Sequence, residues 1–231
     1  MLSPRFPQDP CLILSDSGVE SLLACALASE QQQLSAGSAS MLLAAWWGQD
    51  DVDLDLLISA IEPALIHQAS TYGLRTDPQR ALFPPDEPTA MGLLHTRLLT
   101  EAASIALLSG FRRVVWPVRA ASFTHTDGRS QEDLIELIGT MIDRALLVSR
   151  LVSLDATPDT AVEVVIETPF VDLTDEQLYD LSEDLSIPIE TCWWHSARTL
   201  PAAQRIAQRW ASIPTRSSLQ IEPKPGSQTR V

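Results

Sequence analysis

Residues 15–21 combine hydroxyl, acidic and glycine residues in a short stretch, SDSGVES, that follows an apolar run. A helix that begins after a glycine-bearing turn presents free backbone N–H groups, and these form a ready site for an anion such as phosphate. The stretch therefore predicts a nucleotide-binding loop. The residues that would build it are Ser15, Asp16, Ser17, Gly18, Glu20 and Ser21.

The same residues also fit a purely structural interpretation. Asp16 or Ser17 can cap the start of the helix, and the order Ser17, Gly18, Val19, Glu20 is typical of a capping box in which the Glu20 side chain reaches back to a free backbone N–H. Capping explains the polar residues without any ligand. Both interpretations remain open at the level of the loop alone.

The elements that position this loop alternate along residues 10–213. Short apolar runs are typical of buried strands, and the segments between them have helical spacing of apolar residues. We therefore predict a single-domain α/β fold, a doubly wound parallel sheet of about five strands with helices on both faces. The expected strands are residues 11–14, 41–47, 114–118, 162–167 and 187–191, and the expected helices include residues 22–27, 53–74, 89–108, 131–150, 177–185 and 201–211.

The ends of these elements carry further signals. Ser130 is the expected cap of the helix over 131–150, and Thr174 with Gln177 predicts a capping box before the next helix. Residues 1–9 are interpreted as an N-terminal extension. Residues 214–231 are rich in proline and polar residues without periodicity, which predicts a disordered tail.

Composition and charge exclude several classes of function. The chain has 231 residues, is 45% hydrophobic and carries a net charge of −14, which disfavours nucleic acid as a partner because such binding needs clustered Lys and Arg. No apolar run approaches the ~18 residues of a membrane span, and the N-terminus lacks the pattern of a signal peptide, so a cytoplasmic location is expected. The only lysine is Lys224, in the tail.

Three segments together resemble a known family. LSDSGVES, the segment TPFVDLTDEQLYDLSEDLSIPIET, and the helix over 89–108 followed by VVWPV resemble, in order and spacing, the 7-cyano-7-deazaguanine synthases, which belong to the PP-loop ATP pyrophosphatases. The resemblance implies a PP-loop (adenine nucleotide alpha hydrolase-like) fold with ATP and magnesium as candidate ligands. It also implies queuosine-precursor synthesis, in which a deazaguanine carboxylate is adenylated and converted to a nitrile with ammonia.

The resemblance also identifies a substrate loop. The family places an aspartate and a nearby arginine after the strand that corresponds to residues 114–118, and Asp127 and Arg129 occupy such a loop here. An aspartate can accept two hydrogen bonds from an amidine-like base edge, which suits a deazaguanine. The alternative is that Asp127 and Gly128 form a turn and Arg129 is solvated.

Departures from the family pattern fall at charged and metal-binding positions. Asp16 and Ser17 stand where the family has a serine and a glycine, and Asp175 stands where it has a lysine. The run PDEP at 85–88 replaces an arginine-bearing run. Of the family's four zinc-binding cysteines only Cys192 has a counterpart, so zinc is not expected.

Two functions are therefore compatible with the sequence. The chain is either a divergent ATP-dependent ligase of this type with weakened or lost catalysis, or a non-catalytic relative that binds a nucleotide, another small molecule or a protein. Two tryptophan pairs, Trp46 with Trp47 and Trp193 with Trp194, could line a base pocket or simply pack in the core. A homo-oligomer or a protein partner is compatible with both functions.

Overall fold

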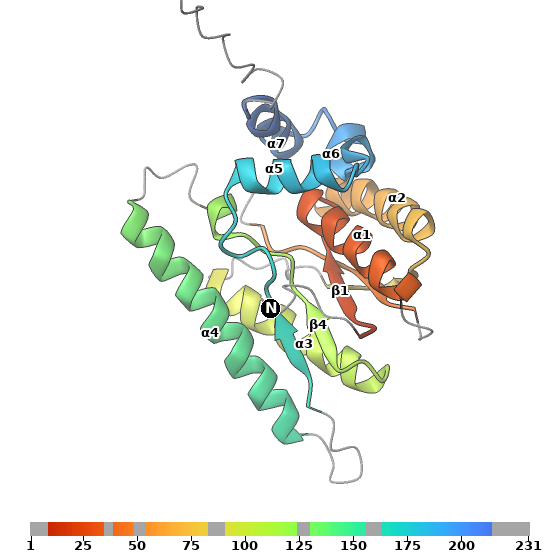
Figure 1. Cartoon of the computed structure of the whole chain (residues 1–231), viewed down its shortest axis with the longest axis vertical. Helices are drawn as coiled ribbons and strands as arrows, with labels where there is room; N and C mark the ends of the chain where they lie inside the picture. The colour runs from red at the N-terminus through yellow and green to blue at the C-terminus, as the bar shows by residue number, and fades with distance from the viewer. Residues whose placement is uncertain are drawn as a thin grey trace, which may run out of the picture.

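A computed structural model describes residues 9–34, 39–48, 54–82, 91–123, 130–155 and 163–213 of the chain. Strands and helices alternate through these residues (Figure 1). The strands are β1 (Leu12–Ser15), β2 (Met41–Ala45), β3 (Arg75–Leu82), β4 (Arg113–Val115) and β5 (Val165–Glu167). The helices are α1 (Val19–Leu34), α2 (Leu54–Tyr72), α3 (Met91–Leu108), α4 (Gln131–Asp155), α5 (Asp175–Asp184), α6 (Trp193–Ser196) and α7 (Pro201–Ala211), with short 3-10 turns η1 (Ala120–Phe123) and η2 (Ile189–Thr191).

The five strands form one parallel sheet in the order β3-β2-β1-β4-β5. The central strand β1 pairs Leu12 with Met41 of β2 on one side and with Val114 of β4 on the other. All four residues of β1 are buried, as expected for a strand with helices on both faces. The predicted fold class, a doubly wound α/β sheet of about five parallel strands, is confirmed.

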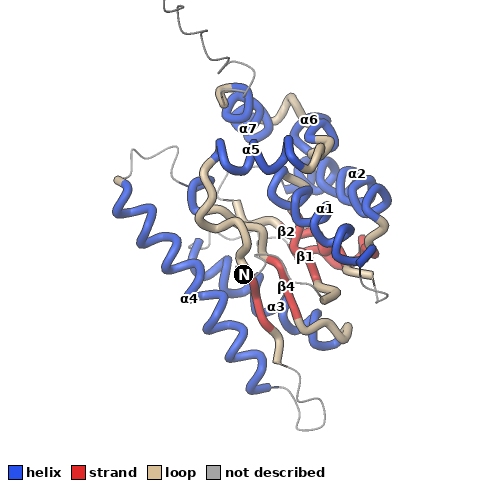
Figure 2. The backbone as a smooth tube through the Cα atoms, viewed as in Figure 1, coloured by secondary structure: helices blue, strands red, loops and turns tan. Residues whose placement is uncertain are grey.

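Alternate residues of the strands enter two different cores. Ile13, Leu42 and Val115 pack with α1 and α2, and the neighbouring Leu12 and Leu43 pack with α3 and α4 on the opposite face. The short helices α5, α6 and α7 extend the first of these cores beyond the end of the sheet (Figure 2). This arrangement follows from the two-residue repeat of strand side chains.

One predicted strand was wrong. Residues 187–191 form no strand and instead contain the turn η2, whereas β3 was not predicted at all. The sequence of β3, RTDPQRAL, has no apolar run and contains Pro78. Such a strand is tolerated because β3 lies at the edge of the sheet and pairs only with β2.

The expected caps agree with the structure. Ser130 accepts a hydrogen bond from the backbone N–H of Asp133, and Thr174 and Gln177 form the predicted capping box at the start of α5. Helix α4 runs to Asp155, five residues further than expected, and β4 ends before Pro117, earlier than expected. The proline run at 84–88, most of the N-terminal extension and the predicted tail lie outside the described residues.

The order of strands reverses between β1 and β4, which lie side by side although they are far apart in the chain. At such a point the loops that leave the carboxyl ends of the two strands diverge to opposite faces of the sheet and open a crevice. The loop over 15–21 leaves β1 at this position, as predicted. No helix among the described residues is long and apolar enough to cross a membrane.

Candidate functional site

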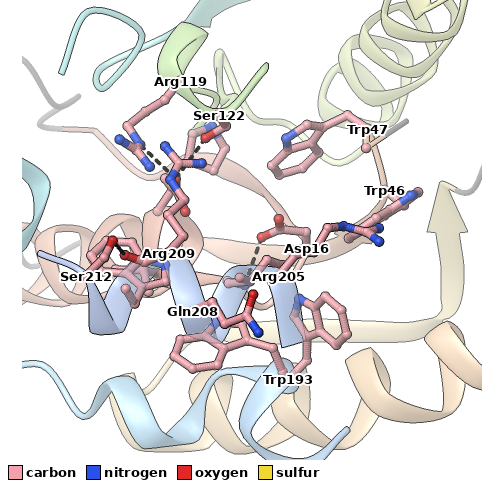
Figure 3. Close-up of a pocket in the computed structure, with 18 residues that line it drawn as sticks. Asp16, Trp46, Trp47, Arg119, Ser122, Trp193, Arg205, Gln208, Arg209 and Ser212 are labelled. Atoms are coloured by element: carbon pink, nitrogen blue, oxygen red, sulfur yellow. Dashed lines mark hydrogen bonds and ion pairs between the residues drawn. The ribbon is translucent and has the colours of Figure 1, made fainter. Parts of the chain in front are cut away.

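A pocket of about 680 Å³ lies in this crevice, beyond the carboxyl ends of β1, β2 and β4. Its walls come from the loop over 16–20, from residues 46–48 after β2, and from Pro117, Arg119 and Ser122 after β4. Helices α6 and α7 close the remaining side (Figure 3). The pocket is therefore built from segments of nearly the whole domain, and the loop after β1 forms its floor.

The carboxylate of Asp16 occupies the centre of this loop. Its Oδ1 accepts the backbone N–H of Gly18 at 2.8 Å and the hydroxyl of Ser21 at 2.7 Å, while the N–H of Asp16 itself donates to Ser21 Oγ at 3.2 Å. These are the donors that a bound phosphate would use at the start of a helix. The chain thus satisfies them with its own anion.

Ser17 adopts a conformation that favours glycine. Its φ is +58°, in the left-handed region, which is strained for a residue with a side chain. The strain is offset by hydrogen bonds, because Ser17 Oγ donates to the carbonyl of Ile61 and the carbonyl of Ser17 accepts from Gln68 and from the N–H of Trp193. The predicted Ser17–Glu20 capping box is therefore wrong, and Asp16 is the residue that accepts from the helix start.

Gly18 is required by the position of Asp16. A Cβ at residue 18 would lie 2.9 Å from Asp16 Oδ1, closer than such atoms approach one another. Ser15, Ser17 and Ser21 are fully buried, and only Asp16 and Glu20 of the loop retain partial exposure. The polar residues of this loop therefore hold its backbone, and two carboxylates face the pocket.

Burial, with a smaller contribution from the charge of Glu20, raises the pKa of Asp16 from its usual value to about 6. The hydrogen bonds from Ser21 and Gly18 oppose this rise without cancelling it. The ionised carboxylate is consequently held in the loop at a free-energy cost. Within the described part of the chain its second oxygen, Oδ2, accepts no hydrogen bond.

A chain of ion pairs links four segments around the pocket. Arg119 is 1% exposed, and it donates through Nε to Glu20 at 2.7 Å and through Nη1 to Asp175 at 2.6 Å. Arg209 of α7 donates to both oxygens of Asp175, at 2.7 Å from Nε to Oδ2 and through Nη2 to Oδ1. Although burial alone would raise it, the hydrogen bonds from Arg209 and the charge of Arg119 hold the pKa of Asp175 well below its usual range.

The network engages two of the three arginines that line the pocket, Arg119 and Arg209; the third is Arg205 of α7. Asp175, which stands where the resembling family has a lysine, is the shared partner of Arg119 and Arg209. The inverted charge at Asp175 is predictable from the sequence, but its two arginine partners are not. Arg119 directly follows the predicted strand VVWPV, and a charged residue at the carboxyl end of a strand is a candidate site residue. The sequence pattern of α7 gives no such indication for Arg209.

Both tryptophan pairs identified in the sequence line the pocket, and Trp210 of α7 joins them. The rings of Trp46 and Trp193 meet edge to face, with centroids 5.9 Å apart. The backbone carbonyl of Trp47 lies 3.1 Å from Nε2 of the buried His95, and burial lowers the pKa of His95 to about 4, so its ring is neutral at pH 7. The contact with His95 thus fixes the backbone of Trp47, one of the tryptophans that line the pocket.

Asp127 and Arg129, the expected substrate residues, lie outside the described residues. Among the described residues no group of three or more His, Cys, Asp or Glu side chains is arranged to hold a metal ion. Cys192 is buried, and the ring of His195 packs on Trp194 with centroids 4.0 Å apart.

No family model matches the chain, and no curated protein sequence matches it. The chain is similar in structure to the U34-tRNA thiolase NcsA from Methanococcus maripaludis, solved with its [4Fe-4S] cluster, with a TM-score of 0.47 and 10% identity over 94% of this chain and 74% of that one. A likeness at this level carries no conclusion about family or activity.

The raised pKa of Asp16 predicts the effect of Asp16→Asn on stability. A carboxyl whose folded pKa exceeds its unfolded value of about 3.9 binds extra protons when folded, so its contribution to stability falls as pH rises from about 4 to 6. Asparagine keeps an acceptor for Gly18 and Ser21 and carries no charge. We expect Asp16→Asn to raise the free energy of unfolding at pH 7.5 by about 2 kcal/mol, and to lose this advantage near pH 4.

Urea unfolding at both pH values measures this difference. Glu101→Gln, which removes an exposed carboxylate on α3, is the matched control and should change stability little at either pH. A loss of stability in Asp16→Asn that is equal at pH 7.5 and pH 4 would contradict the proposed burial of charge.

The ion-pair network predicts that Arg209 fixes α7 against the pocket. Arg209→Ala removes both hydrogen bonds from α7 to Asp175 and should lower the free energy of unfolding by about 2 kcal/mol. Amide hydrogen exchange should rise in α7 more than in α3. Gln208→Ala, which removes an exposed polar side chain one residue earlier on α7, is the control, and equal exchange in the two variants would show that α7 is held by apolar packing alone.

Proposed function

We propose that this chain is a divergent, non-catalytic relative of the PP-loop ATP pyrophosphatases, and that it binds a small planar heterocycle in the tryptophan-lined pocket without turning over ATP. The observation that carries this proposal is the carboxylate of Asp16, which accepts the Gly18 N–H and Ser21 hydroxyl that a phosphate would need. The 7-cyano-7-deazaguanine synthases are the family that the sequence resembles.

The relationship is supported by three features. The strand order β3-β2-β1-β4-β5 brings the loop over 15–21 to the switch point, where ligands of open α/β sheets bind. Ser17 has the left-handed φ of a glycine, and glycine is the residue that the resembling family has there. The buried serines on either side hold the loop in the shape of a helix-start anion site.

The charged side chains around the pocket disfavour phosphoryl or adenylyl transfer from ATP. Transfer of a phosphoryl or adenylyl group depends on cations that stabilise the developing negative charge. Here Arg119 and Arg209 are engaged by Glu20 and Asp175, and an ATP phosphate would meet the Asp16 carboxylate at short range. Like charges at such distances repel strongly in a partly buried site.

The class of ligand that we propose is chosen from the tryptophan rings, the volume and the carboxylate that line the pocket. Tryptophan rings contribute flat apolar surfaces, and a volume of about 680 Å³ suits a small molecule. Asp16 Oδ2 has no donor among the described residues, so it can accept from a ligand N–H. A planar heterocycle with an amine or amidine edge, neutral or cationic, satisfies both the rings and the carboxylate.

Retained ligase activity is the competing hypothesis. It requires magnesium to bridge the carboxylates of Asp16 and Glu20 to the phosphates of ATP, since both side chains line the pocket. Magnesium would then offset the repulsion that otherwise excludes ATP. The two hypotheses differ in which ligand binds and in whether pyrophosphate is released.

Titration of the chain with 7-deazaguanine and with 2-aminobenzimidazole, followed by calorimetry and tryptophan fluorescence, tests the proposal. We expect binding of at least one of these probes, weakened about tenfold by Asp16→Asn and by Trp210→Ala, a half-buried tryptophan that lines the pocket, because each removes one class of contact with the ligand. Affinity should also fall as pH drops below about 6, where Asp16 takes up a proton. Glu101→Gln, which removes an exposed carboxylate on α3, is the control and should leave affinity unchanged.

ATP with magnesium is the comparison ligand in the same titration. We expect no saturable binding below millimolar concentrations, and no pyrophosphate release with a deazaguanine carboxylate and ammonia. Micromolar ATP affinity with steady pyrophosphate release would contradict the proposal and favour the ligase. Failure of both probes and of ATP would contradict the assignment of the pocket as a binding site.

A further inference from the structure

The carboxylate of Asp16 differs from the other carboxylates around the pocket in its lack of a cationic partner. Glu20 pairs with Arg119, and Asp175 pairs with both Arg119 and Arg209. Among the described residues Asp16 forms no ion pair, and its hydrogen bonds come from a backbone N–H and a hydroxyl, which are both neutral. A half-buried charge is normally paired, so the carboxylate of Asp16 lacks a counter-ion.

Two carboxylate oxygens on the pocket wall are available to a ligand. Oδ1 of Asp16 accepts both of the hydrogen bonds above, and Oδ2 has no donor among the described residues. Oε1 of Glu20 accepts from Arg119 at 2.7 Å and from Ser122 at 3.3 Å, and Oε2 of Glu20 has no donor in this part of the structure either. A ligand that carries two N–H groups can donate to both oxygens.

The tryptophans around these oxygens suit a positive charge. Five of the six tryptophans of the chain line the pocket, and the half-buried Trp210 is the most exposed of the five. The carboxylate of Asp16 lies between the labelled rings of Trp46, Trp47 and Trp193 (Figure 3). The face of an indole ring attracts a cation more strongly than the face of any other aromatic side chain. The rings and the unpaired carboxylate therefore favour the same kind of ligand.

An inorganic cation suits this pocket less well than an organic one. Magnesium and calcium need about six oxygen ligands, and among the described residues no group of three or more His, Cys, Asp or Glu is arranged to hold a metal ion. The volume of about 680 Å³ matches a small molecule and not a single ion. A delocalised planar cation such as a guanidinium is also weakly hydrated, so it loses little when it lies against tryptophan.

We propose that the pocket binds a planar organic cation of the amidinium or guanidinium class, whose N–H groups donate to Asp16 Oδ2 and Glu20 Oε2. This inference rests on the function proposed for the pocket and narrows its ligand from any planar heterocycle to a positively charged one. Arg119 and Arg209 do not oppose the cation, because Glu20 and Asp175 balance their charges. The net charge of −14 also attracts cations to the chain as a whole.

Isothermal titration calorimetry of the full chain with benzamidine and with benzamide tests the charge of the ligand. The two probes have the same shape and both carry N–H donors, but only benzamidine is a cation. We expect benzamidine to bind at least about tenfold more tightly at pH 7.5, because it adds a Coulomb attraction that the neutral probe lacks. Phenyltrimethylammonium, a cation without N–H groups, should bind about tenfold more weakly than benzamidine.

Asp16→Asn should bring the affinities for benzamidine and benzamide to within about twofold of each other, because it removes the unpaired charge and keeps the size of the side chain. Glu101→Gln, which removes an exposed carboxylate on α3, is the matched control and should leave the preference for benzamidine unchanged. Magnesium at millimolar concentration should not displace benzamidine from the unaltered chain.

Proton release gives a second measurement of the same contact. The cation binds the ionised form of Asp16, whose pKa is about 6, so benzamidine should release about half a proton at pH 6 and almost none at pH 8. Titrations in two buffers with different enthalpies of ionisation measure this release, which Asp16→Asn should abolish. The other charged or titratable groups around Asp16 are Glu20 of α1, Arg119 after β4, the buried thiol of Cys192, and Arg205 and Arg209 of α7.

The outcomes separate this inference from the function on which it rests. Equal affinities for benzamidine and benzamide would overturn the cationic ligand and leave the binding of a neutral heterocycle intact, as would binding of 7-deazaguanine without binding of benzamidine. Displacement of benzamidine by magnesium, or equally tight binding of phenyltrimethylammonium, would also overturn the inference. Binding of none of the organic probes would overturn both the inference and the proposed function.

Discussion

The carboxylate of Asp16 is the interaction on which the loop after β1 depends. By accepting from Gly18 and Ser21, it closes the turn between β1 and α1 and fixes the direction in which α1 leaves the sheet. In this position it leaves no room for a Cβ at residue 18, and it places a half-buried charge at the switch point. The free donors at the start of α1 are thus satisfied by a carboxylate from within the chain.

The ion pairs around Arg119 connect the loop after β1 to the other segments that line the pocket. Glu20 and Asp175 come from the starts of α1 and α5, where negative charge also interacts favourably with the helix dipole. Arg209 brings α7 into the same network, so the helix that closes the pocket is fixed by a charge pair rather than by apolar contacts alone. Removing one member would leave a poorly solvated charge, which is why the four groups are expected to act as a unit.

The sequence was sufficient for the fold class because the buried strands are short apolar runs and the helices between them are strongly periodic. It failed for β3, whose polar residues and Pro78 are acceptable only at a sheet edge, and edge position is a property of the assembled sheet. In the loop it identified Asp16 as a cap or an anion-site residue, but the left-handed conformation of Ser17 is held by hydrogen bonds to α2 and to Trp193, the first residue of α6. The pKa shift of Asp16 comes from its burial in the folded chain. Arg209 joined the site through packing of α7, which no local pattern encodes.

Direct titration of the Asp16 carboxyl by carbon-detected NMR, with the resonance assigned by its absence in Asp16→Asn, is the sharpest test of the claim that this side chain fills the loop. If the carboxylate is buried against Gly18 and Ser21 beside Glu20, its midpoint lies near pH 6 and does not move when inorganic phosphate is added. A midpoint near pH 4 would contradict the account, because it would mean that Asp16 is solvated outside the loop and that the loop donors are open to a phosphate.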